Sequence, residues 1–173
     1  MDWYSTVFEL IDMRSFSNLW FWIALAVFWS SASHWVLGVP YDLVLRARRV
    51  GGQAERDLED IARVNVNRVL YVARVSGPWL VGIGTFLLSS LGILGFFYGV
   101  EFAQSVFLLG LPMSGVAALN TATARRIEQD QAHGPLLYKR LARCRVYTQM
   151  IGMASIFVTA LWGMYQNLSL GAF

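Results

Sequence analysis

Charge is scarce in this sequence, and its scarcity argues against an ordinary soluble protein. Charged side chains make up only 14% of the residues, against about 25% in a typical soluble domain. Apolar residues make up 56% of the sequence and gather in long runs. Such runs are typical of membrane spans and not of the core of a soluble protein of this size. The excess of basic over acidic residues is only +3, which argues against a nucleic-acid-binding surface. We therefore expect a chain whose solvent is lipid.

Cysteines and catalytic motifs are equally scarce. Cys144 is the single cysteine, so no disulfide can form within the chain. The sequence holds no HExxH, GxSxG, P-loop or CxxC motif, and no GxGxxG that follows a predicted strand. No Asp, Glu, Lys or Arg lies deep within an apolar run, although proton relays and ion pathways depend on such residues. We expect neither catalytic machinery nor a cofactor, and so no enzyme.

The apolar runs predict an all-α, polytopic membrane protein that forms one domain. The clearest run covers residues 79–98 without a single charge. A helix rises ~1.5 Å per residue, so a run of this length covers the ~30 Å hydrocarbon core of a bilayer. The four predicted transmembrane helices cover residues 19–39, 79–98, 105–122 and 146–165.

The segments outside these runs predict two further helices. In residues 1–14, Trp and Phe side chains share one face, which is typical of an amphipathic helix lying at the membrane interface. Residues 42–78 form a polar loop in which a helical pattern starts at Ala54. This amphipathic helix is expected to run along the membrane surface, or to rise into the second span with a bend at Gly77-Pro78. Its apolar face is expected to contain Leu58, Ile61, Ala62, Val69, Val72 and Ala73. Residues 123–145 form a second polar loop, in which His133-Gly134-Pro135 breaks the chain between two helical pieces.

Basic residues predict the orientation in the membrane. The chain has 14 of them: seven in residues 42–78, six in residues 123–145, and Arg14. Four spans place both loops on one side, where the positive-inside rule puts them in the cytoplasm. Both termini are then expected on the outer side.

Small residues at four-residue spacing predict where helices pack against each other in lipid. Gly95 and Gly99 form such a pair on the second predicted span. A matching stripe on the third span contains Gly110, Ser114, Ala118 and Ala122. Gly152, Ser155, Thr159 and Gly163 give similar edges to the fourth span.

His34 is the one histidine within a predicted span, and no Asp, Glu, Lys or Arg lies deep within any of the spans. With Ser30 one turn earlier, it resembles the small-xxx-His pattern by which light-harvesting polypeptides hold a chlorophyll magnesium. That resemblance implies a pigment or tetrapyrrole site. Two other interpretations stay open: a hydrogen bond to a neighbouring span or to the interface, and a proton or quinone site.

Two basic clusters lie next to predicted spans and suggest contact with anionic lipid, since each basic residue near a membrane surface contributes roughly 1 kcal/mol. A role in setting topology alone is the alternative. The clusters are Arg46, Arg48 and Arg49, and Lys139, Arg140, Arg143 and Arg145.

The N-terminal sequence carries a family resemblance. It runs from Met1-Asp2-Trp3-Tyr4 to Ile11-Asp12-Met13-Arg14-Ser15-Phe16-Ser17-Asn18-Leu19-Trp20. This stretch resembles small, uncharacterised four-span inner-membrane proteins of alphaproteobacteria, sometimes labelled "component of SufBCD complex". The resemblance implies a bacterial inner-membrane location with periplasmic termini. The label implies iron–sulfur cluster assembly, but cluster scaffolds need several cysteine ligands and this chain has one.

Taken together, these features predict a non-catalytic accessory or scaffold subunit. Its partners would be membrane lipids and other membrane subunits or further copies of itself. The alternative is an oligomeric small transporter or channel subunit. Its pore would then be lined by the polar residues Ser30, Ser31, Ser33, His34, Asn120 and Gln149.

Overall fold

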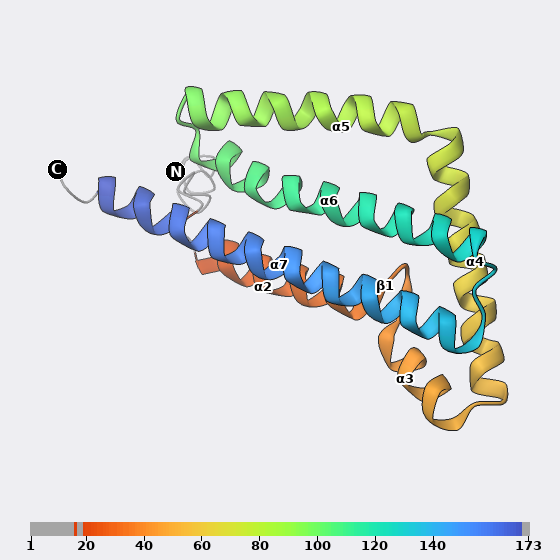
Figure 1. Ribbon diagram of the computed structural model, residues 1–173. Helices are drawn as coiled ribbons and strands as arrows, with labels where there is room; N and C mark the ends of the chain where they lie inside the picture. Colours follow the sequence, from red (N-terminus) through yellow and green to blue (C-terminus); the bar gives the residue numbers. More distant parts are fainter. Residues whose placement is uncertain (1–15, 17–18, 171–173) are drawn as a thin grey trace, which may run out of the picture.

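Long helices lie side by side in an elongated bundle, and two more lie at one end (Figure 1). The computed structural model describes residue 16 and residues 19–170. The helices along the bundle are α2 (Leu19–His34), α5 (Gly77–Gly92), α6 (Glu101–Gln129) and α7 (Gly134–Leu170). The helices at the end are α3 (Tyr41–Val50) and α4 (Gln53–Val75), and a π-helical turn, η2 (Ile93–Phe97), continues α5. The interfacial helix predicted for residues 1–14 lies outside the described residues.

Three helices are long and apolar enough to cross a membrane: Gly77–Phe97, Glu101–Gln129 and Gly134–Leu168. Only 6%, 22% and 28% of their apolar windows are buried inside the protein, so most of their surface faces the surroundings. Apolar side chains exposed at this density need lipid or other apolar partners to cover them. The structure thus confirms a mostly helical fold, and it places helices that are long and apolar enough to span a membrane at three of the four predicted positions.

The first predicted span, residues 19–39, is shorter in the structure than expected. Helix α2 ends at His34 after 16 residues, which corresponds to ~24 Å. A small antiparallel hairpin follows, with strands β1 (Trp35–Val36) and β2 (Val39–Pro40). Leu37 and Gly38 turn the chain with φ of 53° and 73°. The Asn65 side chain of α4 donates a 3.1 Å hydrogen bond to the Gly38 carbonyl, so a contact from a distant helix holds this turn in place.

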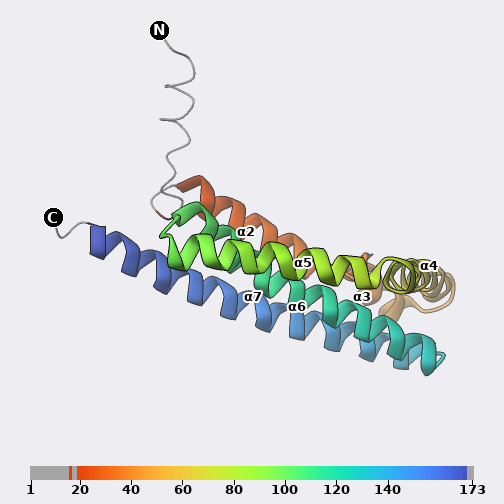
Figure 2. The same ribbon diagram turned by 90° about the horizontal axis from the view of Figure 1, so that it is seen from above.

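The polar segment 42–78 forms two helices rather than one. Gly51 and Gly52 separate α3 from α4 and both have positive φ, which glycine adopts without steric cost. Figure 2 shows α4 nearly end-on, whereas α5, α6 and α7 are seen from the side. Helix α4 therefore crosses the ends of the other helices. If those helices span a membrane, α4 therefore runs along its surface.

The polar segment 123–145 contains the two predicted helical pieces, and these continue α6 and α7 rather than forming a separate loop. Helix α6 continues to Gln129 and α7 begins at Gly134, which leaves only residues 130–133 between them. Ala124 and Ile127 of α6, and Leu137 and Leu141 of α7, are buried in a cluster that includes Leu58 of α4. Because their apolar side chains lie at three- and four-residue spacing, both helices can stay regular beyond the membrane.

Candidate functional site

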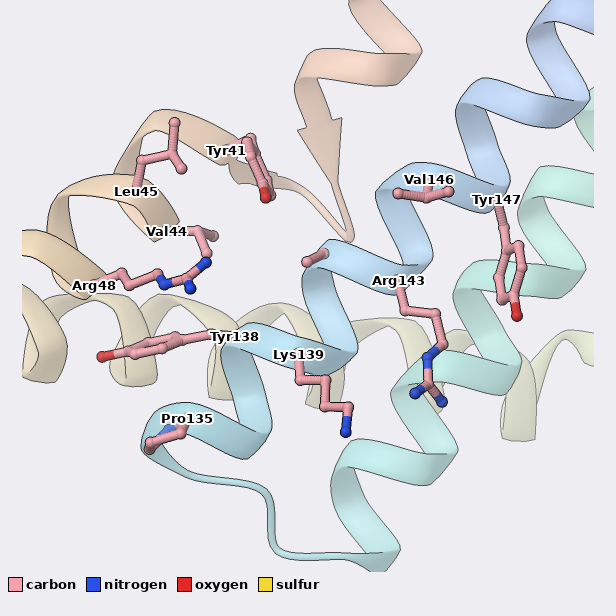
Figure 3. Close-up of a pocket in the computed structure, with 11 residues that line it drawn as sticks. Tyr41, Val44, Leu45, Arg48, Pro135, Tyr138, Lys139, Arg143, Val146 and Tyr147 are labelled. Carbon is pink, nitrogen blue, oxygen red and sulfur yellow. The ribbon is translucent and has the colours of Figure 1, made fainter.

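A groove lies between α3 and the first turns of α7, and the side chains that line it are drawn in Figure 3. Its volume is about 620 Å³, and it is open to the surroundings. Its lining residues are Tyr41, Val44, Leu45, Arg48, Pro135, Tyr138, Lys139, Ala142, Arg143, Val146 and Tyr147. The groove is thus basic, aromatic and apolar at once.

Three cations line this groove. Arg48 comes from α3, whereas Lys139 and Arg143 lie one turn apart on α7 and so share one side of that helix. All three side chains are exposed, and no carboxylate of the described residues lies within 4.0 Å of any of them. None of the three cations therefore has an ion-pair partner among the described residues, which leaves their charges available to an anion.

The apolar part of the groove lies next to the apolar stretch of α7. Val44 is buried at its floor, whereas Leu45, Val146 and Tyr147 are exposed. Val146 also marks the start of the apolar stretch of α7, so the groove lies where the polar turns of this helix meet its lipid-facing part. If α7 spans a membrane, cations in this position lie at the level of the lipid headgroups.

Tyr138 is held neutral beside the cations, in the polar first turns of α7. Burial, a hydrogen bond with Glu55 and the negative charges of Glu55 and Glu59 raise the pKa of Tyr138 to about 12. The phenol therefore keeps its proton at physiological pH. Tyr138 thus adds a polar, uncharged side chain to the lining and does not reduce the positive charge of the groove.

The other predicted lipid-binding residues have different neighbours. Arg145 stacks on the ring of Tyr41 with 3.9 Å between its guanidinium carbon and the ring centroid. Arg140 forms an ion pair with Asp130. Arg46 and Arg49 are exposed on α3 and do not line the groove. Of the two predicted clusters, the structure thus brings Arg48, Lys139 and Arg143 together.

Most of the predicted small residues do lie at helix contacts. A side-chain carbon added to Gly95 would approach the Gln104 backbone nitrogen at 2.9 Å, and one added to Gly152 would approach the Trp29 ring at 2.8 Å. Gly110 packs on Leu88, and Gly163 lies against Trp22 and Phe16. On the same face of α7, Ser155 and Thr159 are buried, and the Ser155 hydroxyl is 3.5 Å from the Leu108 carbonyl.

Gly99, Ser114 and Ala118 differ from this expectation. Gly99 lies in the turn before α6 with φ of 71°, and nothing lies within 4 Å of a side-chain carbon added there. It serves the turn and not a helix contact. Ser114 and Ala118 are exposed on α6, and the Ser114 hydroxyl donates to the Leu111 carbonyl of its own helix. Within residues 19–170, no helix packs on this part of the predicted stripe.

A buried glutamine joins three helices at the end opposite α4. Gln104 is 3% exposed and donates from Nε2 to the Gly95 carbonyl at 2.8 Å. Its Oε1 accepts hydrogen bonds from Trp162 Nε1 at 2.9 Å and Gln166 Nε2 at 2.7 Å. In the sequence, Gln104 falls in the short link between the predicted spans 79–98 and 105–122. Its position next to an apolar run gave no signal that its amide would be buried.

His34 lies at the end of α2 and is half exposed. Its Nε2 is 3.9 Å from Asp42 Oδ1 of α3, and its ring packs edge-on against Trp35. Among the described residues, its contacts with Asp42 and Trp35 thus come from the surface at this end of the bundle. They do not form a closed pocket in which a tetrapyrrole ring would fit.

The other polar residues assigned to a pore come from three helices: the serines from α2, Asn120 from α6 and Gln149 from α7. Ser30 and Ser31 are exposed on α2, and Ser33 and Gln149 are partly buried. Asn120 accepts a 3.3 Å hydrogen bond from the buried Cys144 thiol, which joins α6 to α7. None of these residues lines the groove between α3 and α7.

No protein family, curated protein or solved structure matches this chain.

Proposed function

We propose that this chain is a non-catalytic integral membrane protein that serves as an accessory or scaffold subunit of a larger membrane assembly. The observation that supports this most is α5, in which no residue is buried although the helix is long and apolar. The exposed Ser114, Gly115 and Ala118 on α6 add a surface that lets another helix approach closely. The buried polar groups Gln104 and Asn120, in turn, are occupied in joining helices of this chain.

We place the protein in a bacterial inner membrane with α2 as a fourth span. Trp29 and Trp22 of α2 pack on Gly152 and Gly163 of α7, so α2 follows a helix that is long enough to cross. Helix α2 carries no Asp, Glu, Lys or Arg. With α3 and α4 in the cytoplasm, thirteen of the 14 basic residues lie on the cytoplasmic side and both termini are periplasmic.

Cysteine labelling tests this topology. Native Cys144 is buried, so Cys144→Ala provides the background for Leu19→Cys, Arg56→Cys and Tyr98→Cys, all at exposed positions. In spheroplasts, a membrane-impermeant maleimide is expected to label Leu19→Cys and Tyr98→Cys at once, and Arg56→Cys only after lysis. Protection of Leu19→Cys together with Arg56→Cys would mean that α2 does not cross.

Purification from the native membrane in mild detergent tests the accessory role. Mass spectrometry of the tagged protein is expected to find a stoichiometric membrane partner. A homo-oligomer without a partner would contradict this role and would lead to liposome flux assays of the transporter alternative. An absorbance spectrum of the same sample tests the tetrapyrrole alternative, because a bound pigment would make His34 a ligand.

A further inference from the structure

We propose that the groove between α3 and α7 binds the headgroup of an anionic phospholipid from the cytoplasmic leaflet. The lipid phosphate lies among Arg48, Lys139 and Arg143, and the acyl chains run along α7 beyond Val146. The inference depends on the membrane insertion described above. It does not depend on the accessory role.

Charge is the first argument. Arginine and lysine are the residues that bind phosphate best, the first through a planar fork of donors and the second as a compact point charge. Here they come from two helices onto one groove, and no carboxylate of the described residues lies within 4.0 Å of them. An anion in the groove would therefore meet several cations that have no anionic partner.

The apolar lining identifies the anion as part of a lipid. A free phosphate would leave Leu45, Val146 and Tyr147 exposed beside it. A phospholipid covers them, because its glycerol and acyl chains continue from the phosphate toward the apolar stretch of α7. Figure 3 shows Val146 and Tyr147 on α7 one turn beyond Arg143, in the direction in which that helix becomes apolar. Tyrosine at this junction is also typical of the membrane interface.

The remaining basic residues provide a matched control. Arg46 and Arg49 on α3, and Arg125 on α6, are exposed cations outside the groove. Changing Arg48, Lys139 and Arg143 to glutamine removes as much charge as changing these three. A diffuse attraction between a basic surface and anionic lipid responds equally to both triple variants, whereas a binding site responds mainly to the first.

Native mass spectrometry of the full-length protein, titrated in neutral detergent with phosphatidylglycerol or phosphatidylcholine, tests the proposal. We expect one retained phosphatidylglycerol per chain and no comparable retention of phosphatidylcholine. The groove triple variant is expected to bind phosphatidylglycerol about 10- to 100-fold more weakly, since each basic residue near a lipid headgroup contributes a few-fold or more. The control triple variant is expected to change binding less than about two-fold, in line with screened, distant charges.

Two further arms keep the outcome decisive. Lys139→Arg changes the side chain but keeps the charge, and it is expected to bind as the native chain does. It shows whether binding depends on charge at this position, even if the triple variant does not fold. Inorganic phosphate and glycerol 3-phosphate are expected to compete only at far higher concentration than the lipid. Equal loss in both triple variants, equal binding of phosphatidylcholine, or full competition by free phosphate at lipid concentrations would each overturn the proposal. A failed partner search would leave it standing.

Discussion

Gly95→Val is expected to destabilise the protein by about 1–3 kcal/mol, the usual cost of forcing extra atoms into a packed contact. A side-chain carbon at this position would lie 2.9 Å from the backbone nitrogen of Gln104 and 3.1 Å from its Cα. These are main-chain atoms, which cannot move aside as the end of a side chain can. The whole of η2 would have to move away from α6. The change is measured as a lower thermal unfolding midpoint in detergent.

Gly82→Val is the matched control for this prediction. Gly82 lies on the same apolar helix, and nothing lies within 4 Å of a side-chain carbon added there. Both substitutions add the same atoms and the same β-branched side chain, so helix propensity changes equally. We expect little change in the midpoint for Gly82→Val. Equal shifts for both variants would show that close contact between η2 and α6 is not what limits stability.

Gln104→Leu is expected to cost about 2 kcal/mol, because three hydrogen bonds that average roughly 0.6 kcal/mol each in membrane proteins are lost together. The leucine fills much of the same volume but leaves the Gly95 carbonyl and the Trp162 indole without their partner. The free energy of unfolding is measured by denaturant titration in mixed micelles. A thermal midpoint of the same variant provides a second readout.

A double-mutant cycle separates the hydrogen bonds from simple packing. Trp162→Phe removes the indole donor, and its cost should be smaller when Gln104 is already leucine, with a coupling energy above about 0.5 kcal/mol. Ser114→Ala is the control, since that hydroxyl is exposed and bonds only to its own helix. Strict additivity of Gln104→Leu and Trp162→Phe would contradict a direct bond between them.

The sequence predicted where the membrane-spanning helices lie but not where they end. Residues 79–98 carry no charge, and hydropathy alone locates such a run. Hydropathy shows where an apolar run ends, whereas α6 and α7 stay helical well beyond the ends of their apolar runs. Residues such as Leu137 and Leu141 keep α7 helical beyond its apolar run because they are buried in a cluster with residues of α3, α4 and α6. The end of α2 was wrong for a related reason, since the turn at Gly38 depends on Asn65 from another helix.

The amphipathic face of α4 was predicted only in part. Leu58 and Ala62 are buried as expected, whereas Ile61 is 39% exposed and Val72 is 42% exposed. Val66 and Leu70 take their place on the buried face. Apolar spacing defines which residues share a face, but the direction in which that face turns depends on where α6 and α7 lie.

The sequence predicted the basic character of the groove but not which residues line it. The sequence identified both basic clusters next to the spans. It could not show that Arg48 would line a groove with Lys139 and Arg143, while Arg140 would pair with Asp130 and Arg145 would stack on Tyr41. Which cations stay available depends on contacts between helices that are distant in sequence. Such contacts carry no periodic signal.

The packing of α2 on α7 has a consequence for biosynthesis, because these helices come from opposite ends of the chain. Trp29 lies against Gly152 and is only 3% exposed in the finished protein. Chains are made from the N-terminus, so α2 leaves the ribosome long before its main partner exists. The Trp29 ring therefore lacks its Gly152 contact until α7 has been made. The packing of α2 on α7 can form only after the synthesis of that helix.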